Sequence, residues 1–573
     1  MRTIISDFAA GAACSVSDRS ILRLKRLAIP LSWPAARWNR TILNWCWLFV
    51  GLGILIRLVR FLLRFPLWGD EASLAANLLN RSFLELLDPL EFQQVAPPLF
   101  LWIELAAVRL FGFNEWALRA FPFVCSLLSV VLFRYFASRL LRGVPLLVSV
   151  ATMSVAYYPL RHGSEVKPYA SDLLVALVLL SLAVAWLCRP SRTRWLWILA
   201  AFVPFALALS FPATFVAGGV IFTLALRAWR SPHVWAALCA CCASLLTSFG
   251  LLFFFSTDVQ MDAANEEGIM QTYWSHAFPP LTSAGRFLHW GVAIHTGQMF
   301  AYPLGGASSG SGSVAFLGFV VAILFLVRRR RGVELALCLA PFAVNFVAAA
   351  VHAYPYGGCA RTTQHLAPAI CLAVGLGTTR LLSLCHGPTL QRPAIVSCMG
   401  LLVLFGAVLM IGDLIHPYRS EHDRRVREFA RWFWIDKAIG SELVCACTDL
   451  ELGIFQRTYL WRGIAQYLCN QRIYSPRHKR GGKRPNLDAV SEDHPLRCVV
   501  FSRPGLSRDE KVFSNWLGAM QAEFDWVGYE RNDFYKPHDH GPDIERIEVF
   551  EFVPHPSTRE ARALSRNRQT YAF

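Results

Sequence analysis

The sequence predicts a polytopic α-helical membrane protein with about 11–12 transmembrane helices and a C-terminal extracytoplasmic α/β domain. Of its 573 residues, 55% are hydrophobic, and the mean hydropathy is +0.39. The apolar residues form continuous runs of about 17–24 residues, long enough to cross a bilayer as helices. Soluble domains instead repeat their apolar residues with periods of 2 or 3.6. From about residue 417 onward the chain becomes charged and contains no such run.

Residues 1–41 are predicted to be a basic cytoplasmic N-terminal tail. They carry Arg23, Lys25 and Arg26, and no apolar run begins before Ile42. A secretory signal peptide has an apolar core directly after its basic start. The tail is therefore not expected to be a signal peptide.

Residues 42–416 form the predicted transmembrane domain. The run 97–112 is short and contains Glu104 and Arg109, so we expect it to be re-entrant or shallow, which leaves about eleven full crossings. The candidate spans are 42–63, 97–112, 117–138, 143–160, 170–188, 195–209, 211–228, 233–256, 313–328, 332–352, 365–383 and 394–416.

Basic clusters between the spans indicate which loops face the cytoplasm. Such clusters remain on the cytoplasmic side of a membrane, and they are SRLLRG, RPSRTR, RAWRSPH and RRRRG. The net charge of +17 is thereby explained by topology and contact with anionic lipids, and we expect no nucleic-acid partner. We expect a multi-pass protein of the cell (inner) membrane. The predicted outer loops are 64–96, 157–169, 257–312 and 353–364.

Residues 417–573 are predicted to form the extracytoplasmic α/β domain. A helical pattern, VREFARWFWIDKAI, is followed by short apolar segments typical of strands: ELVCAC, RCVVFS and IEVFEFV. The basic, glycine- and proline-containing stretch 474–492 is predicted to be an exposed loop.

Acidic, basic and aromatic residues gather in the predicted outer loops. Asp70 and Glu71, in the segment WGDEAS, follow the first span directly. A carboxylate at a water–membrane boundary suits a general base that takes a proton from a hydroxyl or an amine. The same pair is also typical of the first turn of a helix, where carboxylates interact favourably with the helix dipole. Basic side chains that could hold a leaving phosphate are Arg161, His162, Lys167, Arg361 and His365.

The order of these features resembles the GT-C superfamily of membrane glycosyltransferases. It is closest to the family 39 type, which includes protein O-mannosyltransferases and lipid A aminoarabinose transferases. The resemblance covers about residues 45–420, and a trailing domain also occurs in several bacterial members. The segments that carry it are, in order, WGDEAS, APPLFLW, FGFNEWALRAFP, SEVKPYASD and YPYGGCARTTQHLAP.

This resemblance implies a polyprenyl-phosphate-linked sugar donor and inverting transfer to an acceptor, which is left open as a protein, a glycan or a lipid. Asp70 matches the catalytic acidic position, with Glu71 beside it. Many members have a His or Lys before the paired prolines, where this chain has Ala96, so no phosphate contact is implied there. The implied donor- and phosphate-binding residues are Arg161, Glu165, Lys167, Tyr169, Arg361 and His365.

No cofactor is expected, because the activated donor supplies the energy of transfer. Some GT-C relatives that use diphosphate donors hold a divalent ion between carboxylates, whereas monophosphate donors usually need none, so a metal is not favoured.

The alternative function is a transporter or flippase of a lipid-linked molecule. Such proteins usually place ionisable residues in the middle of their spans. Here most spans have uncharged cores, and the charges gather on one face. Arg57 and Arg134 are the main exceptions, and we expect both to extend toward a span end. This distribution favours the transferase.

Overall fold

The computed structural model describes residues 26–29, 35–79, 81–229, 231–264, 272–306, 310–384, 388–433, 442–447, 486–502, 510–538 and 541–556. Three predictions lie wholly or partly outside these residues: most of the N-terminal tail, the end of the helical pattern after residue 433, and the loop up to residue 485.

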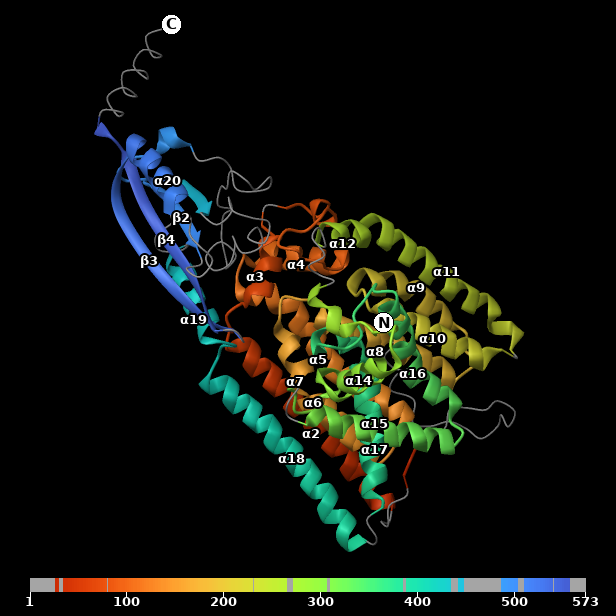
Figure 1. Ribbon diagram of the computed structural model, residues 1–573. Coiled ribbons are helices and arrows are strands. Elements are labelled where there is room, and N and C mark those ends of the chain that lie inside the picture. The colour runs from red at the N-terminus through yellow and green to blue at the C-terminus, as the bar shows by residue number, and fades with distance from the viewer. Residues whose placement is uncertain are drawn as a thin grey trace.

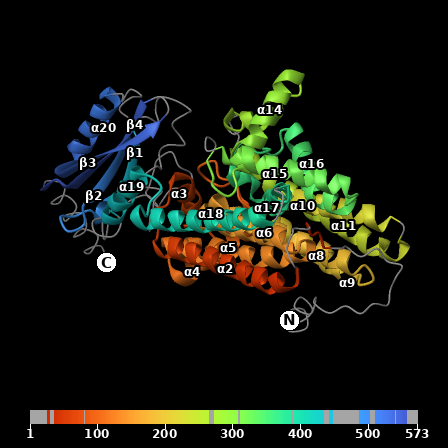
Figure 2. The same cartoon turned by 90° about the horizontal axis from the view of Figure 1, so that it is seen from below.

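A helical bundle forms the larger part of the molecule, with a small sheet domain at one end (Figures 1 and 2). Within the described residues, eight helices are long and apolar enough to cross a membrane. They correspond to α2 (Ala35–Leu62), α5 (Glu115–Leu140), α8 (Tyr169–Cys188), α11 (Trp235–Leu252), α15 (Ser311–Arg328), α16 (Gly332–Ala350), α17 (Ala367–Leu382) and α18 (Pro388–Ile415). The shorter apolar helices are α6 (Val144–Val155), α9 (Arg194–Leu209) and α10 (Ala213–Ala228).

The predicted class, a polytopic helical membrane protein with a C-terminal sheet domain, is confirmed. The short run 97–112 forms α4 (Pro98–Phe111), a helix of 14 residues. At about 1.5 Å per residue this helix is shorter than the hydrocarbon core of about 30 Å. Its re-entrant or shallow placement stays a prediction.

Small residues allow the central helices to approach closely, as is common in membrane bundles. Helix α17 packs against α6 and α15. A side chain on Gly377 would overlap the backbone of Gly318, and one on Gly375 would overlap Ser149. These contacts hold α17 in the middle of the bundle.

The expectation that Arg57 extends toward a span end is wrong. Its side chain is 2% exposed and donates to the Ser126 hydroxyl at 2.9 Å and to the Ser154 carbonyl at 2.8 Å. Burial of a guanidinium is tolerated where neighbouring helices supply hydrogen-bond acceptors. Arg57 therefore joins α2 to α5 and α6 inside the bundle.

The predicted outer loops contain short helices of their own. The α-helical ones are α3 (Gly69–Ala76), α7 (Tyr157–Arg161), α12 (Asp258–Ala264) and α14 (Ala284–Thr296). Helix α11 continues into α12 through a π-helical turn, η4 (Phe253–Thr257). The described 3₁₀ helices are η1 (Glu85–Leu87), η2 (His162–Ser164), η3 (Pro232–Val234), η5 (Ser275–Ala277), η6 (Gln298–Phe300), η7 (Ala360–Leu366) and η12 (Leu487–Ala489).

The C-terminal part begins with α19 (Glu421–Arg431) and contains a four-stranded sheet of order β1-β2-β4-β3. β1 pairs in parallel with β2, while β4 is antiparallel to both β2 and β3. The three predicted strand segments lie in β1, β2 and β4. The elements are β1 (Glu442–Cys447), β2 (Leu496–Ser502), α20 (Glu510–Glu523), β3 (Phe524–His538) and β4 (Gly541–Pro554).

One apolar cluster joins the sheet domain to the loop around α3. Val499 and Val549 of the sheet and Phe429 of α19 belong to the same buried cluster as Leu74 and Leu101, from α3 and α4. Helix α19 is also tied to the bundle by an ion pair, because Arg427 lies 3.2 Å from Glu115 of α5. The sheet domain is thus packed against the segment around α3.

Candidate functional site

Helix α3 presents the two predicted catalytic carboxylates in its first turn. Trp68 is the N-cap residue, and its backbone N–H donates to the Glu71 carboxylate at 3.3 Å. Acidic residues are favoured at this position because the helix N-terminus carries a partial positive charge. The helix-cap interpretation is therefore correct for Glu71. The contacts of the two carboxylates differ beyond this turn.

Glu71 is buried, with 1% of its surface exposed, and both of its oxygens are occupied. Arg119 of α5 binds it in a bidentate manner, at 2.9 and 2.7 Å, and the backbone N–H of Val166 donates at 2.8 Å. Burial raises the pKa of Glu71, and the Arg119 guanidinium opposes this rise. Glu71 thereby ties α3, α5 and the loop 157–169 together.

Asp70, in contrast, has a side chain that is 26% exposed. Its oxygens lie 3.2 Å from the Lys167 ammonium and 3.1 Å from the Arg361 guanidinium, and the Gln94 amide donates at 3.2 Å. Burial alone would raise the pKa of Asp70, but Lys167 and Arg361 outweigh it and hold the pKa below its usual value. Asp70 is therefore an ionised and accessible carboxylate.

Lys167 is held in place by Gln94, a residue of the first predicted outer loop. It is buried at 6% exposure and donates to the Gln94 side-chain oxygen as well as to Asp70. Burial lowers the pKa of Lys167, while Asp70 opposes this decrease. Sequence reasoning missed Gln94 as a site residue, although it stands two residues before Ala96, where relatives carry a basic side chain.

Arg361 reaches Asp70 from η7, after a tight turn at Gly357 and Gly358. Both glycines have a positive φ, of 73° and 71°, and only glycine adopts this conformation without strain. The chain therefore turns tightly at these two glycines. It delivers the Arg361 side chain, 13% exposed, to the Asp70 carboxylate.

Aromatic rings surround the Arg361 guanidinium. Its carbon lies 5.7 Å from the Trp68 ring centre, 5.3 Å from that of Trp274 and 5.8 Å from that of Tyr273. The guanidinium also donates to the Tyr273 hydroxyl at 2.8 Å. Such rings stabilise a cation and leave its outer N–H groups available for an anion.

Arg161 and Glu165 belong to a neighbouring group. Glu165 lies 2.7 Å from His162 and 3.6 Å from Arg161. Burial would raise the pKa of Glu165, but His162 and Arg161 lower it to about 2. The ring of Tyr169 packs edge-on against His162, at 5.2 Å between ring centres. This group supports the loop that carries Lys167.

His365 is placed apart from the other predicted residues. It is 1% exposed, and its ring lies 5.9 Å from that of Phe215 and 6.4 Å from that of Tyr354. The structure gives it no contact with Asp70, Lys167 or Arg361 within the described residues. Of the six predicted donor-binding residues, Lys167 and Arg361 are the two in direct contact with Asp70.

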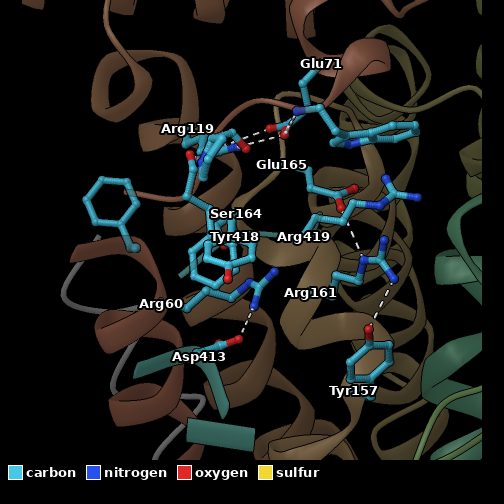
Figure 3. A pocket seen from close by; sticks show the side chains of 14 residues that line it. Arg60, Glu71, Arg119, Tyr157, Arg161, Ser164, Glu165, Asp413, Tyr418 and Arg419 are labelled. Atoms are coloured by element: carbon cyan, nitrogen blue, oxygen red, sulfur yellow. Dashed lines mark hydrogen bonds and ion pairs between the residues drawn. The ribbon is translucent and has the colours of Figure 1, made fainter. Parts of the chain in front are cut away.

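A cavity of about 380 Å³ lies beside this group: Trp68 and Glu71 are among its lining residues, whereas Asp70, Lys167 and Arg361 are not. Figure 3 shows that arginine and carboxylate side chains from several segments point into it. Its lining residues are Arg60, Phe61, Phe65, Pro66, Trp68, Glu71, Arg119, Tyr157, Arg161, Ser164, Glu165, Asp413, Tyr418 and Arg419.

In the part of the chain that the structure describes, no three side chains of His, Cys, Asp or Glu converge as metal ligands would. The charges around Asp70 are balanced by the protein's own cations.

A family model supports the predicted resemblance over part of the chain. The family described as dolichyl-phosphate-mannose-protein mannosyltransferase matches residues 95–249. This segment includes Arg119, Arg161, Glu165 and Lys167, whereas Asp70 precedes it. No match was found among curated protein sequences.

One solved structure supports the fold, and two further structures are similar to a lesser degree. ArnT from Cupriavidus metallidurans in the apo state superposes with a TM-score of 0.50 at 11% identity, covering 89% of this chain and 98% of that chain. The same protein bound to undecaprenyl phosphate gives 0.47 at 12% identity, covering 88% and 98%. The Archaeoglobus fulgidus oligosaccharyltransferase gives 0.45 at 10% identity, covering 78% and 67%.

The resemblance predicted from the sequence, to a membrane glycosyltransferase of the GT-C fold, is thus confirmed. The predicted enzyme class, glycosyltransferase, is confirmed at this level of detail by the family model.

Proposed function

We propose that the protein transfers a sugar from a polyprenyl-phosphate-linked donor to an acceptor at the extracytoplasmic face of the cell (inner) membrane, with inversion at the anomeric carbon. The matching family is named for a dolichyl-phosphate-linked sugar, which supports a donor of this class. The partners are this donor, membrane lipids, and an acceptor that is a protein, a glycan or a lipid.

The observation that carries the proposal is the position of Asp70 between two cations. Lys167 and Arg361 both contact its carboxylate, which is the accessible one of the two acids in α3. A site for sugar transfer from a phosphate needs a base beside cations that can hold the leaving group. This cluster supplies both.

The reaction balances without any further reactant. The acceptor oxygen forms a bond to the anomeric carbon as the bond from that carbon to the phosphate oxygen breaks. The acceptor proton passes to the Asp70 carboxylate. The polyprenyl phosphate departs with the bonding electron pair, and Lys167 and Arg361 compensate its charge.

Binding of the donor also prepares the base. When the donor phosphate accepts hydrogen bonds from Lys167 and Arg361, these side chains interact less strongly with Asp70. The pKa of Asp70 then rises from its depressed value, because the two cations are what lowers it. The carboxylate thus becomes a stronger base when the donor phosphate is bound.

Glu71 acts as a positioning residue in this proposal. Its oxygens are engaged by Arg119, Val166 and Trp68, so it fixes the direction of α3 and the loop that carries Lys167.

The experiment is sugar transfer from a radiolabelled polyprenyl-phosphate sugar in membranes that contain the protein or its Asp70→Asn variant. Asparagine keeps the shape of the side chain and removes the base. We expect transfer to fall at least a hundredfold, the loss typical of a missing general base. Asp88→Asn, at an exposed aspartate of the same loop, is the matched control and should retain activity.

Unchanged transfer by Asp70→Asn would contradict the assigned base. If folded protein consumes no polyprenyl-phosphate donor at all, the transferase is excluded, and transport of a lipid-linked molecule becomes the function to test.

A further inference from the structure

The cavity beside Asp70 is lined by more arginines than carboxylates, and its lining does not include the two cations that contact Asp70. Four arginines and three carboxylates line it, and two of the arginines are already neutralised. Arg119 is held by Glu71, and Arg60 by Asp413 at 2.5 Å. The remaining arginines, Arg161 and Arg419, determine what the cavity can bind.

Arg161 and Arg419 are only partly engaged. Arg161 donates to the Tyr157 hydroxyl at 3.1 Å, and its Nε lies 3.6 Å from Glu165, beyond good hydrogen-bond distance. The Arg419 guanidinium stacks on the Trp68 ring at 4.0 Å and has no hydrogen bond or ion pair within the described residues. Because Arg419 is an exposed residue that borders the cavity, its guanidinium is available to an anion.

Trp68 borders the cavity and also contacts Arg361, which binds Asp70. Arg361 lies against its ring from the Asp70 cluster, and Arg419 lies against it from the cavity. Glu71, the neighbour of Asp70, also borders the cavity. A ligand in the cavity would therefore lie next to the turn that carries the base, without occupying Lys167 or Arg361.

We propose that this cavity binds an anionic group of the acceptor, a phosphate or a carboxylate, through Arg161 and Arg419. This inference rests on the proposed function and names the acceptor class for the same site. In an inverting displacement the nucleophile and the leaving phosphate lie on opposite faces of the anomeric carbon. The acceptor's anion therefore needs cations other than those that hold the donor phosphate, and this cavity provides them.

The tyrosine and phenylalanine side chains of the lining fit an acceptor that is larger than its anionic group. Tyr157 and Tyr418 line the cavity, and so do Phe61 and Phe65 near the end of α2. A charged group can thus be held at Arg161 and Arg419 while the rest of the acceptor extends along these rings.

The experiment uses three matched probes: octyl glucoside, octyl glucoside 6-phosphate and octyl glucuronide. Each is tested as a competitor of radiolabelled transfer. We expect the phosphate, the carboxylate or both to compete at least tenfold better than the neutral glycoside, the gain from one charge-assisted hydrogen bond. The two anionic probes distinguish a phosphate from a carboxylate as the recognised group.

Variants then assign the preference to the cavity. Arg419→Gln should abolish the advantage of the anionic probe, and Arg419→Lys should restore part of it. Arg424→Gln, at an exposed arginine of α19 outside the cavity, should leave the preference unchanged. A merely structural role of Arg419 would weaken all three probes equally.

Three results would overturn the inference. The first is that the neutral probe competes as well as the anionic probes, and the second is that the preference for an anionic probe survives Arg419→Gln. The third is that Arg419→Gln raises the KM of the donor, because the residue would then act on donor binding. Equilibrium dialysis of purified protein with labelled octyl glucoside 6-phosphate needs no transfer. Binding that depends on Arg419 in a protein without transferase activity would support the anion site while the proposed function fails.

Discussion

Asp70 and Glu71 are neighbours in the same helical turn, yet their surroundings differ in almost every respect. Glu71 is enclosed and bound by one arginine and two backbone amides, and its pKa is raised by burial. Asp70 is partly exposed and contacts two cations from two separate loops, and its pKa is lowered. The difference indicates a division of labour, in which Glu71 holds the helix while Asp70 is left able to react.

The largest effect is expected when the buried carboxylate, Glu71, is removed. Glu71→Ala leaves the buried Arg119 without its partner, which typically costs about 3–5 kcal/mol of stability. Thermal unfolding in detergent should show a clear decrease in the midpoint. Glu71→Ala combined with Arg119→Met should be less destabilised than Glu71→Ala alone, because no unpaired charge remains. An unchanged midpoint in Glu71→Ala would contradict the structural role.

The next effect concerns the cation that reaches Asp70 from η7. Arg361→Gln removes a charge-assisted contact to the donor phosphate, so the KM of the donor should rise tenfold or more. Steady-state kinetics with varied donor concentration measures this change. Arg286→Gln, at an exposed arginine of another predicted outer loop, serves as the control and should keep the wild-type KM. A normal KM in Arg361→Gln would remove this residue from the donor site.

The variant Lys167→Met tests the pKa of Asp70 through the pH dependence of the activity. The folded pKa of Asp70 is depressed, so the base stays ionised down to acidic pH and activity is lost only as the pH falls through that value. Without Lys167, burial raises this pKa, and the acid limb of kcat/KM should move to higher pH. The pH profile of the variant beside that of the wild type tests the sign. A limb that does not move would show that Asp70 is not the group that titrates.

The smallest effect is expected from Tyr273, whose hydroxyl accepts a hydrogen bond from Arg361. Tyr273→Phe removes this acceptor and keeps the aromatic contact. Because one such hydrogen bond is worth about 0.5–1.5 kcal/mol, the KM of the donor should change by about two- to tenfold. Competition binding with polyprenyl phosphate alone provides an independent readout, and a change larger than that of Arg361→Gln would contradict the proposed order.

Sequence patterns predicted the spans, the three strand segments and Asp70 with the two cations that contact it. Long apolar runs and ordered motifs were sufficient, because hydrophobic burial and the local chain direction determine these features. The separate roles of Asp70 and Glu71 were not predictable, since they depend on Arg119 and Val166, which are distant in sequence. The same holds for Arg57, whose acceptors on α5 and α6 become visible only when the helices are packed.

His365 shows that a sequence motif can also assign a residue to a site from which the structure separates it. It stands four residues after Arg361 in a motif that the resemblance covers, yet η7 turns its ring toward Phe215 and away from the Asp70 cluster. A motif assigns neighbouring residues to one site, whereas a tight 3₁₀ helix distributes them over different faces.

The buried cluster shared by α3, α19 and the sheet has a consequence for biosynthesis. The loop that carries Asp70 is synthesised before most helices of the bundle, whereas Val499, Ile547 and Val549, which help to bury the apolar surface of this loop, are synthesised after them. A nascent chain therefore exposes that surface until its last strand is in place. Completion of the sheet then makes the folding of the site a late event, long after the bundle has entered the membrane.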